Sequence, residues 1–456
     1  MKRKNVAAPQ NPRHNQPTTL RRLGARPVMT EPNLTGYEWA GSTLRRLLKM
    51  DGPVAESWPF FSGPSRPARV CGSAGVTMRD LVTRLPELLG PRGADPAHHG
   101  QKYFFVKFLD PSDFPPFAYV GFNPTIHTLG RTTKQRKRRF ADLLWRDRQA
   151  VETFAECVRP QITSKQRFEA FKAAYKRWAI AQAKADWSAP VILDVSRFIE
   201  KTSRAQAQTA LARQRQIRRQ IVSLMHRIEF EPDQAILIET PTLHAIAGLS
   251  LQIHPKAPGN FHPKDELWIY KEVPLPRGAT GWILVEPQRT FDKTESGADF
   301  FTPFAWEARG SGGRLGFRKP ITRAYLDQFV ELMDATPHPK SHYVRRAQRM
   351  TVMGGTVRGA ARWYQLVEEP GWPYFTVREL RFAGAGEAVT TLPHHSFVEL
   401  HATRGAVNGL LRNSRGTSSF TVTPTQPVFL PASLPYDTIT YRAAAPAELL
   451  YFTRPR

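Results

Sequence analysis

One stretch of the sequence, residues 241–273, concentrates side chains that are able to bind a metal ion: His244, Gln252, His254 and Glu266. Side chains two residues apart share one face of a β-strand, so we expect Gln252 and His254 to point the same way. The turn after Pro255 then returns Glu266 on a neighbouring strand. Two imidazoles, a carboxylate and an amide oxygen suit zinc or another divalent ion, with one position left open for substrate. The spacing leaves a second interpretation open, in which these histidines only form hydrogen bonds at strand ends.

A second cluster, residues 393–401, repeats the pattern on a smaller scale. Glu399 and His401 are two residues apart and would share one face of a strand. We expect this pair on the exposed face of a C-terminal barrel, with a metal site as the alternative. The sequence contains no nucleophile elbow, Walker loop or glycine-rich dinucleotide turn, so it does not favour a hydrolase or a nucleotide-cofactor enzyme.

The charge balance favours anionic partners. The 456 residues include 65 Lys and Arg against 39 Asp and Glu, a formal net charge of +26. Six basic residues lie between Arg131 and Arg139, and four arginines follow at 213, 215, 218 and 219. Zinc-finger spacing, a recognition-helix motif and interleaved aromatic and basic residues are all missing from the sequence. We therefore expect a solvated basic helix face and regard nucleic acid as an unlikely partner.

Composition also bears on location. Cys71 and Cys157 are the only cysteines, too few for a disulfide framework and wrongly spaced for a thiolate zinc site. No run of eighteen apolar residues occurs, so we expect a cytoplasmic protein without a membrane partner. Residues 1–30 contain no acidic residue, which is typical of a transit peptide but equally of a disordered basic tail, and we expect the tail.

The positions of strands and helices follow from the hydrophobic pattern. We expect strands between Trp39 and Asn123, most clearly at 103–109 and 117–122, where apolar runs alternate with Gly and Pro turns. Residues 128–232 are poor in Gly and Pro and contain segments of helical periodicity such as 167–175. Further strands are expected at 235–238, 282–285, 427–433 and 447–452, and one amphipathic helix at 321–333.

These elements predict a mainly β protein with two β-sandwich barrels around a helical insert. The expected divisions are a disordered basic tail (1–35), the first part of a catalytic barrel (36–127), the helical insert (128–232), the remainder of the catalytic barrel (233–320), a connecting helix and linker (321–344) and a C-terminal barrel (345–456).

Several short motifs resemble the class I mannose-6-phosphate isomerase family, in the family's order along the chain. Glu56-Ser57-Trp58, with Trp39-Ala40-Gly41 before it, resembles the family's Trp-Gly-Gly and Glu-Ser-Trp-Glu opening. Residues 238–246 are similar to its Pro-Ala-Gly-x-x-His-Ala-Ile strand. Residues 105–109 resemble the strand that precedes the family's Gln-Val-His-Pro motif, and residues 284–292 resemble its Leu-Glu-Ile-Gln-Gln-x-x-Asp motif. Residues 304–306 resemble its Val-Tyr-Asp-Trp motif, and residues 429–432 its Leu-Ile-Pro-Ala motif.

The resemblance implies a double cupin with an inserted α-helical domain. It also implies interconversion of an aldose phosphate and a ketose phosphate by Lewis-acid and general-base catalysis around one divalent metal ion, expected to be Zn²⁺. Carried over residue by residue, His244 matches a metal ligand, Lys107 a residue near the substrate phosphate and Glu286 a carboxylate of the pocket. The implied partner is a small phosphorylated sugar; the oligomeric state is left open.

Two family motifs are altered in this chain. Gly121-Phe122-Asn123-Pro124 stands where the family has Gln-Val-His-Pro, and Thr302 stands where it has an arginine. Gln252-Ile253-His254-Pro255, followed by Glu266, is similar to the missing motif at a later position. We therefore expect a metal site rebuilt from His244, Gln252, His254 and Glu266, with Arg289 or Arg309 stabilising enediolate charge. The expected function is a mannose 6-phosphate to fructose 6-phosphate isomerase; the alternatives are a non-catalytic sugar-binding cupin and a basic nucleic-acid-associated protein.

Overall fold

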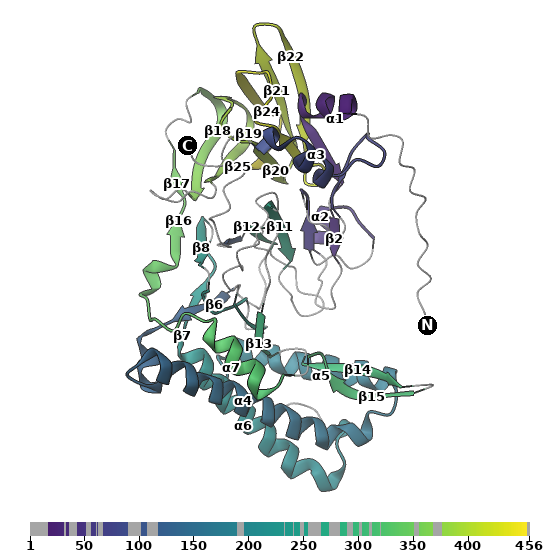
Figure 1. Cartoon of the computed structure of the whole chain (residues 1–456), viewed down its shortest axis with the longest axis vertical. Coiled ribbons are helices and arrows are strands. Elements are labelled where there is room, and N and C mark those ends of the chain that lie inside the picture. Colours follow the sequence, from purple (N-terminus) through teal and green to yellow (C-terminus); the bar gives the residue numbers. More distant parts are fainter. Residues whose placement is uncertain are drawn as a thin grey trace.

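A computed structural model describes most of the chain, and all structural statements below refer to the residues it describes. These are 17–31, 33–35, 43–51, 56–60, 62, 67–89, 102–106, 117–188, 196–231, 233–239, 241–246, 250–253, 266–272, 283–289, 295–300, 303–309, 312–319, 321–350, 355–367 and 376–453. Sheets and helices are arranged in layers along the long axis of the molecule (Figure 1). None of the described helices combines the length and apolar character that crossing a membrane requires.

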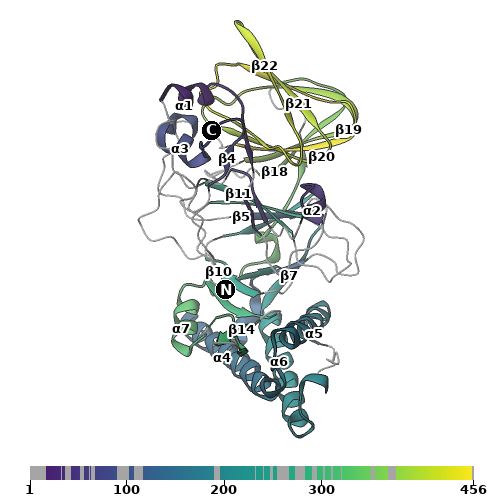
Figure 2. The ribbon, with the colours of Figure 1, turned by 90° about the vertical axis from the view of Figure 1, so that its right-hand side faces the viewer.

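The C-terminal region forms a curled eleven-stranded sheet (Figure 2). Its main order is β22-β21-β24-β19-β25-β20-β23-β1-β4, and β18 pairs with both β19 and β17. The sixteen-residue β19 pairs with three strands, which allows the sheet to curl around a core that includes Leu380, Leu400 and Leu449. The strands are β17 (Gln348–Arg349), β18 (Val357–Val367), β19 (Thr376–Thr391), β20 (Val398–Arg404), β21 (Val407–Asn413), β22 (Gly416–Val422), β23 (Val428–Leu430), β24 (Thr438–Ala443), β25 (Ala447–Thr453), β1 (Val28–Glu31) and β4 (Arg69–Val70).

Two further sheets lie between this sheet and the helices (Figures 1 and 2). The seven-stranded sheet has the order β16-β8-β5-β12-β11-β3-β2, with β16 (Val344–Arg346), β8 (Gln234–Ile238), β5 (Lys102–Val106), β12 (Ile283–Arg289), β11 (Glu266–Glu272), β3 (Glu56–Trp58) and β2 (Asn33–Thr35). The five-stranded sheet has the order β13-β10-β9-β6-β7, with β13 (Glu295–Asp299), β10 (Ser250–Ile253), β9 (His244–Ile246), β6 (Phe117–Phe122) and β7 (Met225–Glu229).

Strand β8 shows why the layers stack in this order. Its side chains are buried on both faces, as expected for a strand between two layers. Ile236 and Ile238 belong to the core that includes the five-stranded sheet and the helices, whereas Ala235 and Leu237 belong to the core shared with the C-terminal sheet. The seven-stranded sheet therefore separates the two cores.

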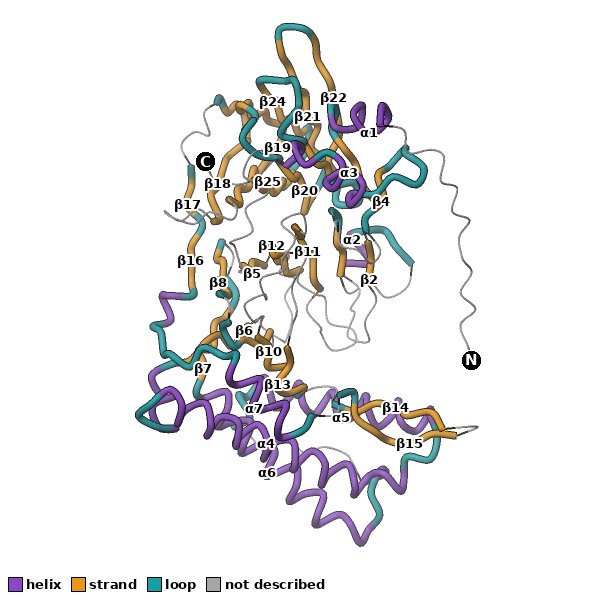
Figure 3. The backbone as a smooth tube through the Cα atoms, in the orientation of Figure 1, coloured by secondary structure: helices purple, strands orange, loops and turns teal. Residues whose placement is uncertain are grey.

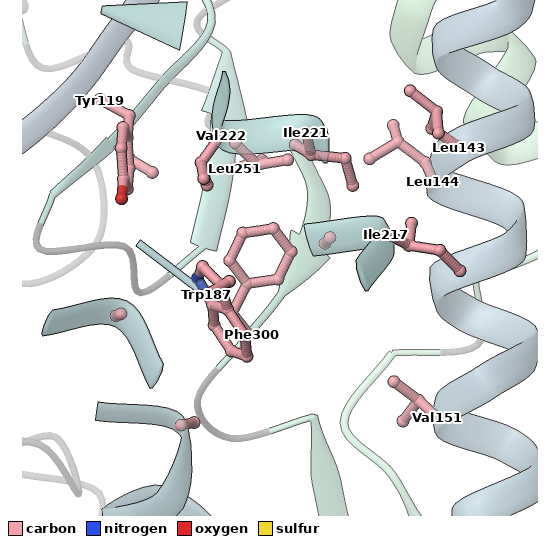
Figure 4. Packing of buried hydrophobic residues seen from close by; sticks show 14 of the residues in the cluster. Tyr119, Leu143, Leu144, Val151, Trp187, Ile217, Ile221, Val222, Leu251 and Phe300 are labelled. Atoms are coloured by element: carbon pink, nitrogen blue, oxygen red, sulfur yellow. The ribbon is translucent and has the colours of Figure 1, made fainter. Parts of the chain in front are cut away.

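The helical layer covers the outer face of the five-stranded sheet (Figure 3). It contains α4 (Thr133–Val158), α5 (Lys165–Lys184), α6 (Arg204–Ser223), α7 (Arg323–Glu331) and the hairpin of β14 (Phe304–Arg309) and β15 (Gly312–Phe317). The N-caps Thr132, Ser164 and Thr322 each accept a hydrogen bond from the first turn, which is why α4, α5 and α7 begin where they do. Leucines and isoleucines of α4 and α6 interdigitate beneath the sheet (Figure 4).

The remaining elements are short. Near the N-terminus lie α1 (Pro17–Gly24), α2 (Thr43–Leu47) and α3 (Met78–Arg84). The 3-10 turns are η1 (Pro86–Leu89), η2 (Pro124–Leu129), η3 (Arg159–Gln161), η4 (Ser196–Phe198), η5 (Lys201–Ser203) and η6 (Lys340–His342).

Two expectations from the sequence require correction. Residues 17–31 and 33–35 are part of the fold and not of a solvated tail, because Leu20, Leu23 and Val28 are buried and β1 pairs with β23 and β4. The stretch 128–232, expected to be helical throughout, ends in strand β7, which pairs with β6. In both places a short apolar segment acquires its partner from a distant part of the chain, so local composition did not reveal it.

Candidate metal and substrate site

The five-stranded sheet presents different residues to its two neighbouring layers. Tyr119 donates a hydrogen bond to Asp186, at the end of α5, so its side chain faces the helices. Leu251 lies on the same side, among the residues packed against α4 and α6 (Figure 4). Because side chains alternate along a strand, Val120 and Gln252 face the opposite way, toward the seven-stranded sheet.

Strand register places predicted site residues in one row on that inner face. Val120 pairs with His226 on one side and with His244 on the other, and His244 pairs with Gln252. Directly opposite residues have their Cβ atoms about 4.5–5.5 Å apart and project to the same face. The structure therefore brings together His244 and Gln252, two of the four predicted metal ligands.

The orientation of His244 suits a ligand. Its side chain is fully buried, and its Nδ1 lies 3.1 Å from the carbonyl oxygen of Thr242. A carbonyl only accepts, so Nδ1 carries the proton and donates it. Nε2 is then the nitrogen with the lone pair, the form in which an imidazole binds a metal ion or accepts a proton.

The altered family motif has a structural role here. Asn123 Oδ1 accepts a hydrogen bond from the backbone N–H of Thr125, and Nδ2 donates to the carbonyls of Ser223 and Met225 at 3.0 and 2.9 Å. The amide thus caps η2 and ties it to the end of α6. Its donors and acceptor are committed to the backbone, so Asn123 does not replace the missing imidazole ligand.

For the other predicted site residues, the structure describes the strand position or nothing. Glu266 begins β11 at the position paired with Arg289 of β12, and Glu286 is paired with Ile269 on the same two strands. These positions belong to the seven-stranded sheet, so the prediction that Glu266 returns on a strand beside that of Gln252 is wrong: β10 pairs with β13 and β9, and β11 with β12 and β3. Arg309 ends β14, whose Phe304 and Trp306 pack against α5, so it belongs to the helical layer. Lys107 and His254 lie outside the described residues.

The described residues contain no group of three or more His, Cys, Asp or Glu side chains arranged to hold a metal ion. The residues that are described, one buried imidazole and one neighbouring amide, are two of the four predicted ligands, and both residue types occur as metal ligands in proteins. The two remaining ligands of the prediction are His254, which is not described, and Glu266, for which only the backbone is described.

Sequence reasoning missed a histidine cluster at the rim of the same sheet. His338 and His342 stack with ring centroids 4.4 Å apart, and His226 donates from Nε2 to the carbonyl of His338 at 2.7 Å. His342 Nε2 lies 2.6 Å from Glu239, and His338 Nε2 lies 3.5 Å from Asp334. The four-residue spacing of His338 and His342 was the one available signal, and it lies in a turn where no regular period was expected.

The second predicted cluster is buried, which corrects the expectation of an exposed face. Glu399 and His401 are 3% and 2% exposed, and His401 Nε2 lies 4.0 Å from Glu399 Oε2. Phe60 and Phe452 contact the imidazole edge to face, at centroid distances of 5.1 and 5.2 Å. Burial raises the pKa of Glu399 well above its usual value and lowers the pKa of His401 to about 3, so both groups favour the neutral form.

Comparisons with known proteins give structural likenesses alone. No family model matches the chain, and no curated protein matches it in sequence. Among solved structures, mannose 6-phosphate isomerase from Bacillus subtilis is 13% identical, with 93% of this chain and 99% of that chain covered and a TM-score of 0.46. The apo form of mannose 6-phosphate isomerase from Salmonella typhimurium is also 13% identical, with 95% and 100% covered and a TM-score of 0.45.

Proposed function

We propose that this protein is a metal-dependent sugar-phosphate aldose–ketose isomerase, with mannose 6-phosphate and fructose 6-phosphate as the first substrates to test. The observation that carries the proposal is the pairing of His244 with Gln252, whose side chain alternates with the helix-facing Leu251 along β10. The motif order of the sequence supports it independently.

In this proposal His244, Gln252, His254 and Glu266 hold one divalent ion, with Zn²⁺ preferred for its acceptance of nitrogen and oxygen ligands. The ion would polarise the sugar oxygens during enolisation. The chain's own residues orient and protect it: the Thr242 carbonyl fixes the His244 tautomer, and the helices cover the outer face of the sheet. Lys107 binds the phosphate and Glu286 lies in the pocket. Arg289, in register with Glu266, is a better candidate than Arg309 for stabilising enediolate charge.

The proposal includes a double cupin with an inserted helical domain, with divisions at 1–35, 36–127, 128–232, 233–320, 321–344 and 345–456. Residues 28–31 instead join the C-terminal sheet, and β2 (Asn33–Thr35) joins the seven-stranded sheet, so the boundary at 35 is moved upstream. The stacking of the five- and seven-stranded sheets supports the first barrel, and the curled C-terminal sheet supports the second. A cytoplasmic location is also proposed, supported by Cys71 and Cys157, which are both free thiols.

A second candidate is a sugar-binding cupin without catalysis. The observation in its favour is the structural commitment of Asn123, which occupies a position where the family has a ligand histidine. This candidate retains a polar pocket but needs no metal. The metal content of the purified protein therefore distinguishes this candidate from the isomerase.

The test is elemental analysis of purified protein combined with a coupled assay for fructose 6-phosphate formation. The variants are His244→Asn, Gln252→Glu and, as a matched control, the exposed His394→Asn. We expect one ion per chain in the wild type and in His394→Asn, no ion in His244→Asn, and retention in Gln252→Glu because a carboxylate supplies the same oxygen ligand.

The outcomes separate the two candidates. Turnover that disappears together with the ion in His244→Asn, while circular dichroism stays unchanged, supports the isomerase. A wild type without metal and without turnover, but with measurable binding of mannose 6-phosphate by calorimetry, would replace it with the sugar-binding protein. Metal retained in full by folded His244→Asn would refute the proposed ligand set.

A further inference from the structure

The helical layer carries a concentrated set of exposed cations, here called the basic face. It consists of Arg131, Lys134, Arg138 and Arg139 around the start of α4, and Arg213 and Arg219 in the second half of α6. All six side chains are exposed. None of them takes part in the proposed isomerase site, which lies on the other side of the five-stranded sheet.

The fold places these two runs on neighbouring helices of the layer, one after the other along the helix pair. Asn123, at the start of the turn that leads into α4, donates to the carbonyls of Ser223 and Met225 at the end of α6. Further along, Arg218 Nε donates to Asp147 Oδ1 at 2.8 Å in the interior. The two helices therefore run antiparallel and side by side (Figure 1), and Arg219, next to Arg218, lies beside the middle of α4.

Most cations of the basic face lack an acidic neighbour among the described residues of the layer, although Lys137, next to Arg138, lies 3.9 Å from Glu331 of α7. Helix α6 contains no acidic residue, and each acidic residue of α4 is paired with a cation outside the basic face. In the part of the chain that the structure describes, no cation of the basic face has an acidic partner. The acidic residues of α4 pair as Asp142 with Arg323, Asp147 with Arg218, Glu152 with Arg148 and Glu156 with Arg159.

These cations do not serve the stability of their helices. The first turn of α4 contains no acidic residue, so the positive end of the helix dipole is surrounded by further positive charge. Lys134 and Arg138, and likewise Arg215 and Arg219, are like charges four residues apart, an arrangement that costs about 0.2–0.5 kcal/mol per pair. A bound polyanion would offset both the unfavourable interaction with the helix dipole and the repulsion between like charges. Solvent at a free surface offsets them less.

We propose that the basic face binds the phosphate backbone of double-stranded nucleic acid without reading its sequence. Single strands are usually held by stacking bases on exposed aromatic rings, and membrane surfaces by inserting apolar side chains. Among the described residues the only exposed large hydrophobic side chains are Met50 and Leu332, and neither lies on the basic face. What α4 and α6 offer is point charges spaced along two antiparallel helices, four around the start of α4 and two on α6, which suits the regularly spaced phosphates of a duplex.

The test measures binding of the full chain to a fluorescently labelled 20-base-pair duplex between 50 and 200 mM salt. The variant Arg138→Gln/Arg139→Gln/Arg219→Gln removes three cations of the basic face. Its control, Arg404→Gln/Arg412→Gln/Arg415→Gln, removes three equally exposed cations from the C-terminal sheet. Each phosphate contact contributes about 0.9 to the slope of log K against log salt, so the wild type should lose about 40-fold more affinity over this range than the variant.

The control should behave as the wild type, and sugar-phosphate turnover should be equal in all three proteins. Equal slopes for the variant and the wild type would overturn the proposal, and so would an equal loss in the control, which would assign the effect to net charge alone. Binding by the wild type to phosphatidylserine vesicles, abolished in the variant, with no binding to the duplex would replace nucleic acid with a membrane surface.

Discussion

The buried pair Glu399 and His401 makes the stability of the C-terminal sheet depend on pH in two opposing ways. The pKa of His401 is lowered to about 3 by burial, so its neutral form is favoured in the folded protein. This contribution to stability is present above about pH 6.5 and is lost as the pH falls toward 3. The pKa of Glu399 is raised by burial, so its contribution is present at low pH and is lost as the pH rises through the raised value.

Because the two effects oppose each other, one must be removed to measure the other. We therefore compare Glu399→Gln with the double variant Glu399→Gln/His401→Gln, since a glutamine at either position is neutral at every pH. For a folded pKa of about 3 and an unfolded value of about 6.5, linkage gives a loss of about 2.5 kcal/mol between pH 7 and pH 4.5 for the variant that retains His401. The double variant should not show this component.

The assay is urea unfolding at pH 7.0, 5.5 and 4.5, followed by tryptophan fluorescence, because Trp363 is buried in the same sheet. At pH 5.5 the expected loss relative to pH 7 is about 1.2 kcal/mol, so the three measurements test the shape of the pH dependence as well as its total size. His394→Gln in the Glu399→Gln background is the control for an exposed histidine. Parallel pH profiles for the two variants would refute the assignment of the neutral form to the buried imidazole.

Two further predictions concern the helical layer and its junction with the sheet. Asp147→Asn leaves the buried Arg218 without its charge partner and should lower the free energy of unfolding, measured with urea, by about 3–5 kcal/mol. The control Glu156→Gln, in the exposed pair with Arg159, should change it by under about 1 kcal/mol. Gly121→Ala should lower the free energy of unfolding by about 2–4 kcal/mol, because Gly121 has φ +53° and an added Cβ would overlap the Tyr343 hydroxyl. The control Gly72→Ala, at φ +68° in open space, should lower it by about 1 kcal/mol. Equal melting temperatures for the two variants would contradict the steric argument.

Strands with a strong local pattern were predictable from the sequence. The apolar run at 117–122 is β6, and those at 235–238 and 447–452 fall within β8 and β25. The helix expected at 321–333 is α7, two residues shorter at each end because Thr322 caps it. Elements whose stability depends on distant partners were missed: α1 is held by burial of Leu20 and Leu23, and β7 by its pairing with β6.

For the site, spacing was sufficient to select His244 and Gln252 but not to show that they are neighbours. They are eight residues apart in sequence, and only the register of β9 against β10 places them opposite each other. The pattern of Glu399 and His401 is equally suggestive in sequence, but burial among Phe60 and Phe452 gives it a different environment. Burial depends on which layers cover a strand, and one strand's sequence does not specify that.

The composition of the inner row shows that burial on this face of the sheet does not require a polar side chain. At the position beside His244 the chain uses Val120, which is fully buried, so this face of the sheet accommodates an aliphatic side chain. A fully buried imidazole in place of an aliphatic residue contributes less apolar burial. Each of its nitrogens that lacks a hydrogen-bond partner also costs about 1–3 kcal/mol of desolvation free energy. The Thr242 carbonyl accepts the hydrogen bond of Nδ1 and so limits that cost for one of the two ring nitrogens. A second valine at this position would carry no such cost, and metal binding by His244, as proposed above, would be the gain that offsets it.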